Sequence, residues 1–308
     1  MSARCAFLGP AGTFAHAAAQ QLTGSAGAEL VPHATVTHAI DALHAGAVQA
    51  AVVPLENSVE GAVPATLDAL AGEAPLVIVA ETFLPVVFDL MARPGTDLAA
   101  IRTIATHPHA EAQVRRYLLS ELPAASVTLV GSTAGGAQAV AAGQYDAAVA
   151  PVISAQLYGL ATLAHDIADN QGAVTRFVLL STPRPAPPPT GNDRTSLVCY
   201  LREDHSGALL QILTEFASRG VNLTRIESRP TKGRIGQYCF SIDCEGHLTD
   251  ARVADALTAL HRVCASVRYL GSYRREDGQQ AAISAGHTDA DFGDAADWLA
   301  KISQHGTA

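Results

Sequence analysis

The chain has 308 residues, of which 48% are hydrophobic and 16% charged, and its formal net charge is −9 at pH 7. This length predicts two domains, and the ordinary composition predicts a globular protein. The apolar runs fall short of the ~18–20 residues that span a membrane, and the N-terminal residues lack a long apolar signal core. Five cysteines without a paired zinc spacing argue against a disulfide framework, so we expect a reduced, cytoplasmic protein.

The charge is unevenly distributed along the chain. Residues 1–182 hold six Arg, no Lys and 14 acidic residues, whereas residues 183–275 have a net charge of +4 and residues 276–308 a net charge of −5. The acidic first half argues against nucleic-acid binding. An anionic ligand held there would depend on neutral donors, helix N-termini and a few arginines.

Before residue 183, short apolar runs alternate with helical patterns. The strand-like runs are "CAFLG" (5–9), "AAVVPLENS" (50–58), "IRTIATH" (101–107), "SVTLVG" (126–131) and "DAAVA" (146–150). Repeated strand-then-helix units predict an α/β sheet with parallel strands. The longer apolar run at residues 74–92 is expected to be strand and to cross between two lobes.

A proline-rich segment, "PRPAPPP" (183–189), predicts a stiff, extended linker. After it, the order strand, helix, strand, strand, helix, strand predicts a ferredoxin-like βαββαβ sandwich. We therefore predict a first domain at 1–182, a linker at 183–193, a second domain at 194–275 and an acidic tail at 276–308. Within the tail, "AADWLAKIS" favours a short helix and the rest loose order.

Small polar residues follow several predicted strands. They are Thr13, Asn57, Ser58, Thr106, Ser132 and Thr133. Helix capping explains each of these turns on its own. However, ligands of α/β sheets bind where strands end and helices begin, so several such turns together predict an anion pocket.

Glu56 differs because capping at its turn does not require a carboxylate. Binding a ligand hydroxyl or acid–base work is one interpretation, and a salt bridge is the other. "HPHAE" (107–111) resembles a metal cluster only superficially, because no second ligand group stands at a recognised spacing. No phosphate-binding loop, G-x-G-x-x-G or G-x-S-x-G motif is present in the sequence, which argues against nucleotide binding and an α/β-hydrolase.

Four segments in chain order, "FLGPAGTF", "PLENSVEG", "THPHAEAQ" and "ADNQGAVTRF", resemble the signatures of the prephenate dehydratase family. "SGALLQILTEFASRGVNLTRIESRP" resembles the phenylalanine-binding part of its ACT domain. The resemblance spans about residues 4–275. It implies a two-lobed, periplasmic-binding-protein-like α/β catalytic domain followed by a ferredoxin-like ACT regulatory domain. With no chorismate mutase segment ahead of the first strand, it implies a monofunctional dehydratase.

The family resemblance also implies an activity. Prephenate would lose hydroxide and CO₂ to give phenylpyruvate in phenylalanine biosynthesis, with phenylalanine as the allosteric effector. Because aromatisation drives the reaction, no cofactor and no metal are implied. Two alternatives stay open, namely an arogenate dehydratase and a non-catalytic two-lobed sensor of a small anion.

By position in the family's motifs, Thr175 is implied as the catalytic hydroxyl, with Glu56 and Asn57 beside it. The implied substrate-binding residues are Thr13, Ser58, Thr106, Gln113, Asn170, Arg176 and Phe177. Thr175 is expected to hydrogen-bond the departing oxygen, with a protonated Glu56 as the alternative donor. Arg176 suits a substrate carboxylate, and its structural alternative is a pair with Asp166 or Asp169. Thr106 stands where the family more often has Ser. His109 stands where Gln is usual, which leaves its role open.

In the ACT domain, the resemblance implies that phenylalanine is enclosed between two subunits. The implied residues are Gly207, Ala208, Leu209, Leu210, Asn222, Leu223, Glu227 and Ser228. An ordinary amphipathic core helix accounts for Leu213 and Phe216. The expected partners are thus prephenate, phenylalanine and further copies of the chain, as a homodimer or homotetramer, without nucleic acid or membrane.

Overall fold

The computed structural model describes residues 3–24, 27–231 and 238–305. The chain forms two compact units, one of residues 1–66 with 82–180 and the other of residues 67–81 with 181–308. In the described ranges, no helix is both long and apolar enough to cross a membrane.

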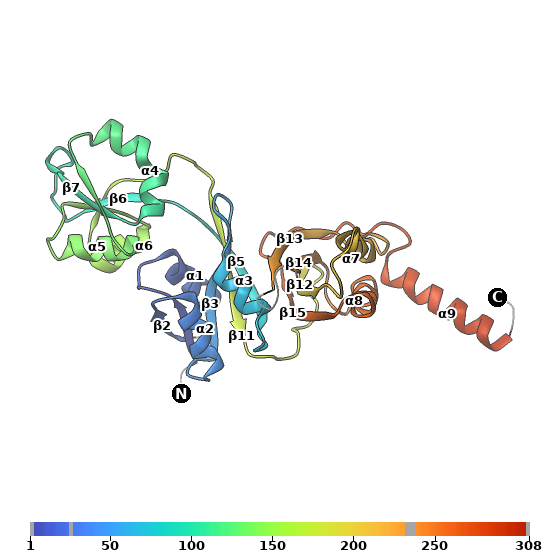
Figure 1. Cartoon of the computed structure of the whole chain (residues 1–308). Helices are drawn as coiled ribbons and strands as arrows, with labels where there is room; N and C mark the ends of the chain where they lie inside the picture. Colours follow the sequence, from blue (N-terminus) through green and yellow to red (C-terminus); the bar gives the residue numbers. More distant parts are fainter. Residues whose placement is uncertain (1–2, 25–26, 232–237, 306–308) are drawn as a thin grey trace. The chain divides into compact units, whose positions relative to one another are not determined.

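The first unit contains two lobes (Figure 1). The first lobe is built on a mixed sheet with the strand order β2-β1-β3-β11-β5, where β1 runs parallel to β2 and β3, and β11 runs antiparallel to β3. Its strands are β1 (Arg4–Leu8), β2 (Glu29–His33), β3 (Ala50–Asn57), β4 (Gly61–Ala62), β5 (Val77–Pro85) and β11 (Val174–Ser181). Helices α1 (Phe14–Thr23) and α2 (Val36–His44) belong to this lobe. Helix α3 (Pro64–Ala71) and strand β5 each extend across the boundary with the second unit, which includes residues 67–81.

The second lobe has its own five-stranded sheet, with the order β10-β6-β9-β7-β8. It consists of β6 (Asp89–Ala92), η2 (Leu98–Ala100), β7 (Thr103–Thr106), α4 (Pro108–Glu121), β8 (Ser126–Leu129), α5 (Thr133–Ala141), β9 (Ala147–Ala150), α6 (Val152–Tyr158) and β10 (Ala161–Ala164). Side chains alternate between the two faces of a strand. Leu90 therefore packs with α4, whereas its neighbour Met91 packs with α5 and α6, so helices cover both faces.

The predicted crossing at residues 74–92 is confirmed, because β5 lies in the first sheet and β6 in the second. The chain returns between β10 and β11. The strand-then-helix units are also confirmed at β1–α1, β7–α4, β8–α5 and β9–α6. The sheets are mixed rather than wholly parallel, since β6, β10 and β11 join their sheets antiparallel to a neighbour. The pair β2 and α2 was not predicted.

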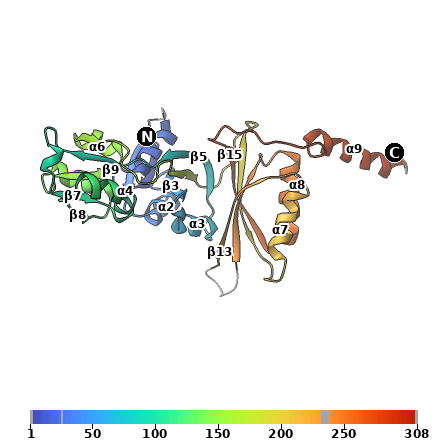
Figure 2. The same cartoon turned by 90° about the horizontal axis from the view of Figure 1, so that it is seen from above.

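The second unit carries the predicted βαββαβ order, which is confirmed. Its elements are β12 (Asp193–Tyr200), α7 (Ala208–Ala217), β13 (Leu223–Pro230), β14 (Tyr238–Glu245), α8 (Ala251–Val263) and β15 (Ser266–Arg274). The strands form an antiparallel sheet in the order β13-β14-β12-β15. Figure 2 shows α7 and α8 on one face of this sheet, where Ile212, Phe216 and Leu260 pack against Leu197 and Ile242.

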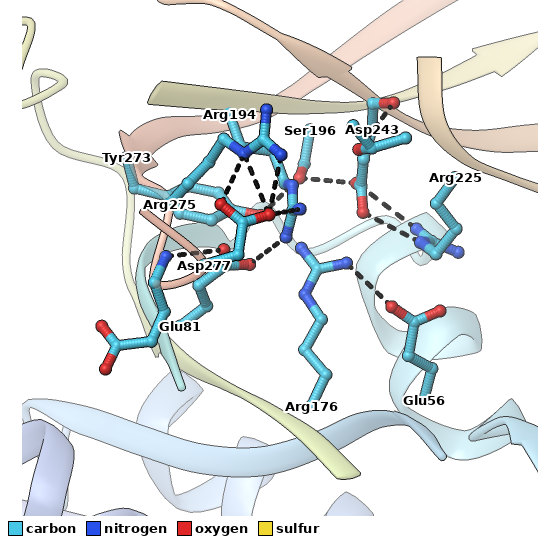
Figure 3. Close-up of polar contacts among 12 residues, drawn as sticks. Glu56, Glu81, Arg176, Arg194, Ser196, Arg225, Asp243, Tyr273, Arg275 and Asp277 are labelled. Atoms are coloured by element: carbon cyan, nitrogen blue, oxygen red, sulfur yellow. Dashed lines mark hydrogen bonds and ion pairs between the residues drawn. The ribbon is translucent and has the colours of Figure 1, made fainter. Parts of the chain in front are cut away.

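The sheet face opposite these helices carries buried polar side chains (Figure 3). The Ser196 hydroxyl donates to Asp243 at 2.7 Å and lies 2.6 Å from the Tyr273 hydroxyl. Arg225 donates to the same Asp243 carboxylate at 2.9 Å. Buried polar groups require hydrogen-bond partners, and here the side chains supply them to one another.

Residues 67–81 belong to this unit and contact its four-stranded sheet. Their recorded contacts join Asp68 to Arg229, the Ala71 carbonyl to Tyr200, the Gly72 carbonyl to Arg268, and Glu81 to Arg194. At Gly271, φ is +134° and an added Cβ would lie 2.2 Å from the Ile78 carbonyl oxygen, so only glycine fits. The sequence carried no signal for this contact, because it joins segments more than 100 residues apart.

The acidic tail contains α9 (Asp289–His305), which is longer than the short helix predicted from "AADWLAKIS". The domain boundaries at 182, 193 and 275 remain predictions.

Candidate active site

A cavity of about 320 Å³ lies between the two lobes of the first unit. The first lobe contributes the ends of β1 and β3 and the start of β11, and the second contributes the starts of α4 and α5. Thr13, His107 and Ser132 cap α1, α4 and α5, each accepting a backbone N–H of its helix. The positive ends of three helix dipoles therefore lie at the cavity wall, which favours an anionic ligand.

Asn57 and Thr175 form the central polar contact of the cavity. They are paired residues of β3 and β11, and the Asn57 amide Nδ2 donates to the Thr175 hydroxyl at 2.8 Å. The Asn57 Oδ1 accepts the backbone N–H groups of Val59 and Glu60 at 2.8 and 3.0 Å. Because a backbone N–H can only donate, this turn fixes which end of the amide faces Thr175. The Thr175 oxygen is thus an acceptor toward Asn57, and its own proton is available to a ligand.

Arg176 does not line this cavity. Its side chain is only 2% exposed, its guanidinium lies 3.2 Å from Glu56 Oε1 (Figure 3), and it sits 5.9 Å from the centre of the Phe83 ring. Alternation along β11 explains this placement, since Thr175 and Phe177 face the cavity from either side of it. The ion pair recorded for Arg176 is with Glu56. Glu56 therefore forms the salt bridge that was one of its two interpretations, and its role toward a ligand stays a prediction.

The remaining predicted residues divide into two groups. Thr13, Gln113 and Phe177 line the cavity together with Asn57 and Thr175. Ser58, Thr106 and Asn170 do not. The Thr106 hydroxyl is fully buried and donates to the Val149 carbonyl at 2.8 Å, so it holds β7 to β9, while the Ser58 hydroxyl accepts the Val174 N–H at 2.9 Å.

Three lining residues were not assigned a role from the sequence, namely Glu60, His107 and His109. His109 Nδ1 lies 2.9 Å from Glu60 Oε2, and Gln113 donates to Glu60 Oε1 at 3.4 Å. Burial lowers the pKa of His107, as does the neighbouring His109, with Glu60 acting in the opposite direction. His107 also accepts the His109 backbone N–H, which requires an unprotonated Nδ1. The "HPHAE" segment therefore belongs to the candidate site, because His107 and His109 line the cavity. In the described ranges, no group of three residues has the geometry of a metal site.

The predicted effector residues lie around the start of α7 and along β13. Gly207 is the N-cap of α7 with φ of +88°, Ala208 is buried, and Leu209 and Leu210 are 37% and 66% exposed. Asn222 precedes β13, and Leu223, Glu227 and Ser228 lie in that edge strand.

A two-lobed α/β domain with an anion-attracting cavity, followed by a βαββαβ domain, is the architecture of a small-molecule-binding protein with an appended second module. The family model described as "Prephenate dehydratase" matches residues 5–185, and the model described as "ACT domain" matches residues 195–262. The chain belongs to the prephenate dehydratase family.

Relatives of known name agree with this assignment. The curated prephenate dehydratase of Amycolatopsis methanolica is 50% identical over 302 residues, covering 98% of each chain. A crystal structure of prephenate dehydratase in complex with L-Phe from Arthrobacter aurescens is 49% identical, with a TM-score of 0.91 over 98% of this chain and 99% of that one. A structure described as GqqA, a quorum-quenching acylase, is 34% identical, with a TM-score of 0.80 over 89% and 99%. The predictions of the family, the fold class and a lyase are thereby confirmed.

Proposed function

We propose that the chain converts prephenate to phenylpyruvate in the cavity between its two lobes. The prephenate dianion yields the phenylpyruvate anion, CO₂ and hydroxide, which takes a proton to become water. The C–C bond to the ring carboxylate supplies the electrons that expel the ring hydroxyl. Aromatisation drives this step, so no redox partner is required. The single observation that carries the proposal is the hydrogen bond from Asn57 to Thr175.

In this mechanism, Thr175 donates a hydrogen bond to the departing oxygen. Its proton is free to do so because Asn57 fills an acceptor site on the hydroxyl. Phe14, Phe88 and Phe177 lie in the cavity wall and exclude water, which strengthens a hydrogen bond to developing negative charge. The N-termini of α1, α4 and α5 complement the two carboxylates.

The Arg176–Glu56 pair has a supporting role in this proposal. It lies beneath β11 and β3 and fixes the strands that carry Thr175 and Asn57. The first expectation, direct contact of Arg176 with a substrate carboxylate, fits this placement less well.

The relative described as an acylase raises the alternative of amide hydrolysis. A nucleophilic threonine needs a base that accepts its proton. Among the described residues, the recorded hydrogen-bond partner of the Thr175 hydroxyl is an amide donor, which favours a hydrogen-bonding role over a nucleophilic one. Arogenate, whose amine replaces the keto group of prephenate, remains the nearest alternative substrate.

Phenylalanine is proposed as the feedback effector at the ACT domain. A relative 49% identical to this chain is described as a complex with L-Phe. Leu209 and Leu210 form an exposed apolar surface that suits contact with a second copy of the chain. The edge strand β13 offers backbone groups that suit the same contact. A homodimer or homotetramer in the cytoplasm is therefore part of the proposal.

The test is phenylpyruvate formation from prephenate and, in parallel, phenylalanine formation from arogenate, each with and without added phenylalanine. Prephenate turnover that phenylalanine suppresses supports both parts of the proposal. Turnover indifferent to phenylalanine removes the regulatory part. Preference for arogenate, or binding without turnover, overturns the catalytic part.

A further inference from the structure

One ion pair joins the two lobes at the cavity. Glu60 lies in the turn between β3 and β4 of the first lobe, and His109 lies in the first turn of α4 in the second lobe. The imidazole Nδ1 of His109 and the carboxylate Oε2 of Glu60 are 2.9 Å apart. Gln113, one turn further along α4, donates to the other oxygen of the same carboxylate at 3.4 Å. Both oxygens of Glu60 are thus held by the opposite lobe.

The charges of the cavity make this pair favourable for binding an anionic substrate. Of the residues recorded in the wall, Glu60 is the carboxylate and none is Arg or Lys. A bare carboxylate there would repel a dianion. The two lining histidines are the groups that can supply positive charge, and His107 must stay neutral at Nδ1 to cap α4. The neutralising charge therefore belongs to His109.

We propose that His109 is a positioning residue that, as an imidazolium, binds Glu60 across the cavity, closes the lobes over the substrate and cancels the carboxylate that would repel it. The inference rests on the proposed function, since it concerns binding of a dicarboxylate in the same cavity. It goes beyond that function in assigning substrate affinity and its pH dependence to a residue outside the reacting centre.

The sign of the pH dependence follows from the pair. The imidazole is positive only when protonated, so the attraction to Glu60 weakens as the pH rises. The titratable groups recorded against His109 are Glu60 on the facing lobe and His107, whose ring centre lies 5.0 Å away. The side chains of His109 and Glu60 are 65% and 41% exposed, so the pair belongs to the weaker class of ion pairs. We expect KM to change by about two- to five-fold.

The test measures kcat and KM for prephenate from pH 6 to 8.5 in His109→Gln, Glu60→Gln and the unaltered enzyme. Gln keeps a hydrogen-bond donor but cannot be charged. The unaltered enzyme should show a KM that rises with pH at nearly constant kcat. His109→Gln should have the high KM at every pH. Glu60→Gln loses the bridge as well but also loses the repelling carboxylate, so its KM should lie below that of His109→Gln.

His165→Gln is the matched control, because His165 is likewise an exposed histidine paired with a carboxylate, Asp89, at 2.8 Å, and neither residue is recorded in the cavity wall. This variant should keep the unaltered KM profile. Calorimetry in two buffers adds a readout apart from turnover: prephenate binding near pH 7.5 should take up protons, and His109→Gln should abolish that uptake. If His109→Gln keeps the KM profile and the proton uptake of the unaltered enzyme, the inference is overturned. A fall in melting temperature alone does not rescue it. Absence of prephenate turnover in the unaltered enzyme refutes the proposed function instead.

Discussion

The amide of Asn57 donates to the hydroxyl of Thr175 across two paired strands, and its oxygen is held by two backbone N–H groups of the following turn. The turn thus sets the direction of the hydrogen bond. A side chain that looks like a turn former in the sequence therefore orients the proton of a hydroxyl 118 residues away.

Replacing Thr175 with Val should lower kcat for prephenate by about 10²–10³-fold, because a preorganised donor to developing negative charge is worth that much. Val keeps the branched shape, so KM and the melting temperature should change little. Thr175→Ser, which retains the hydroxyl, should keep most of the activity. Steady-state assays on folded protein check this, and near-normal turnover in Thr175→Val would falsify the assigned role.

Asn57→Asp tests the direction of the hydrogen bond. The carboxylate still accepts the turn N–H groups, but it cannot donate to Thr175, whose proton would then point at Asp rather than at the substrate. We expect kcat to fall at least about tenfold, and KM to rise from the added negative charge. Urea unfolding should show that the fold is retained. An active Asn57→Asp enzyme with unchanged kcat contradicts the mechanism.

Arg176→Met should act on stability more than on substrate binding. The change removes a buried cation, 2% exposed, from the Glu56 carboxylate, but Glu56 is 35% exposed and reaches water. We therefore expect a loss of about 1–3 kcal/mol in the free energy of unfolding, less than for a fully buried pair. KM should stay within a few-fold. A KM raised more than about 30-fold, roughly 2 kcal/mol, in a stably folded variant would reinstate Arg176 as a substrate ligand.

Stability should fall as the pH drops below neutral, partly through His16. Its Nδ1 accepts the Gly12 N–H at 3.1 Å, its ring stacks on Phe7, and burial lowers its pKa from the ordinary value of 6.5. The unfolded chain then binds the proton at a higher pH than the folded one. The contribution is fully present above about pH 6.5 and is lost as the pH falls below it. Urea unfolding at pH 7.5 and 5.5 should show a smaller pH effect in His16→Gln, and an equal effect in both proteins would count against this assignment.

Glu81→Gln should weaken inhibition by phenylalanine while sparing basal kcat. Glu81 is 3% exposed and paired with Arg194 of β12 at 2.5 Å. Two residues further along β5, Phe83 contacts Arg176, the neighbour of Thr175. The Glu81–Arg194 pair thus fixes β5, the strand whose Phe83 contacts β11, where Thr175 lies. Inhibition curves should shift to higher phenylalanine, and loss of even 1.4 kcal/mol of coupling is tenfold.

The control for this change is Glu245→Gln, which breaks the 2.7 Å pair with Arg275 inside the ACT domain. It should leave the inhibition curve closer to that of the unaltered enzyme. Identical phenylalanine inhibition curves for Glu81→Gln and the unaltered chain would rule out a role of the Glu81–Arg194 pair in inhibition.

The βαββαβ order and the crossings between lobes were predictable because they follow from local periodicity and from a proline-rich boundary. The placement of Arg176 was not, because the residue type indicates carboxylate binding whereas the face of β11 decides what the side chain meets. The contact of Thr106 was hidden for the same reason, since its hydroxyl donates to the Val149 carbonyl inside the second sheet, and a role in substrate binding stays a prediction. The contact of Glu60 with His109 could not be predicted from the sequence, because it exists only where the two lobes meet. β2 escaped prediction because it is short, half exposed and contains Pro32.

The docking of residues 67–81 on the ACT sheet limits how this protein can be taken apart. A regulatory fragment cut at the proline-rich segment would lose the carboxylate of Glu81 and the carbonyls of Ala71 and Gly72 that its arginines and Tyr200 now bind. Its buried polar face would then be open to water or to another copy. Chimeras that exchange regulatory domains between relatives therefore need to carry two pieces of sequence, the C-terminal domain and the short segment that precedes and enters β5.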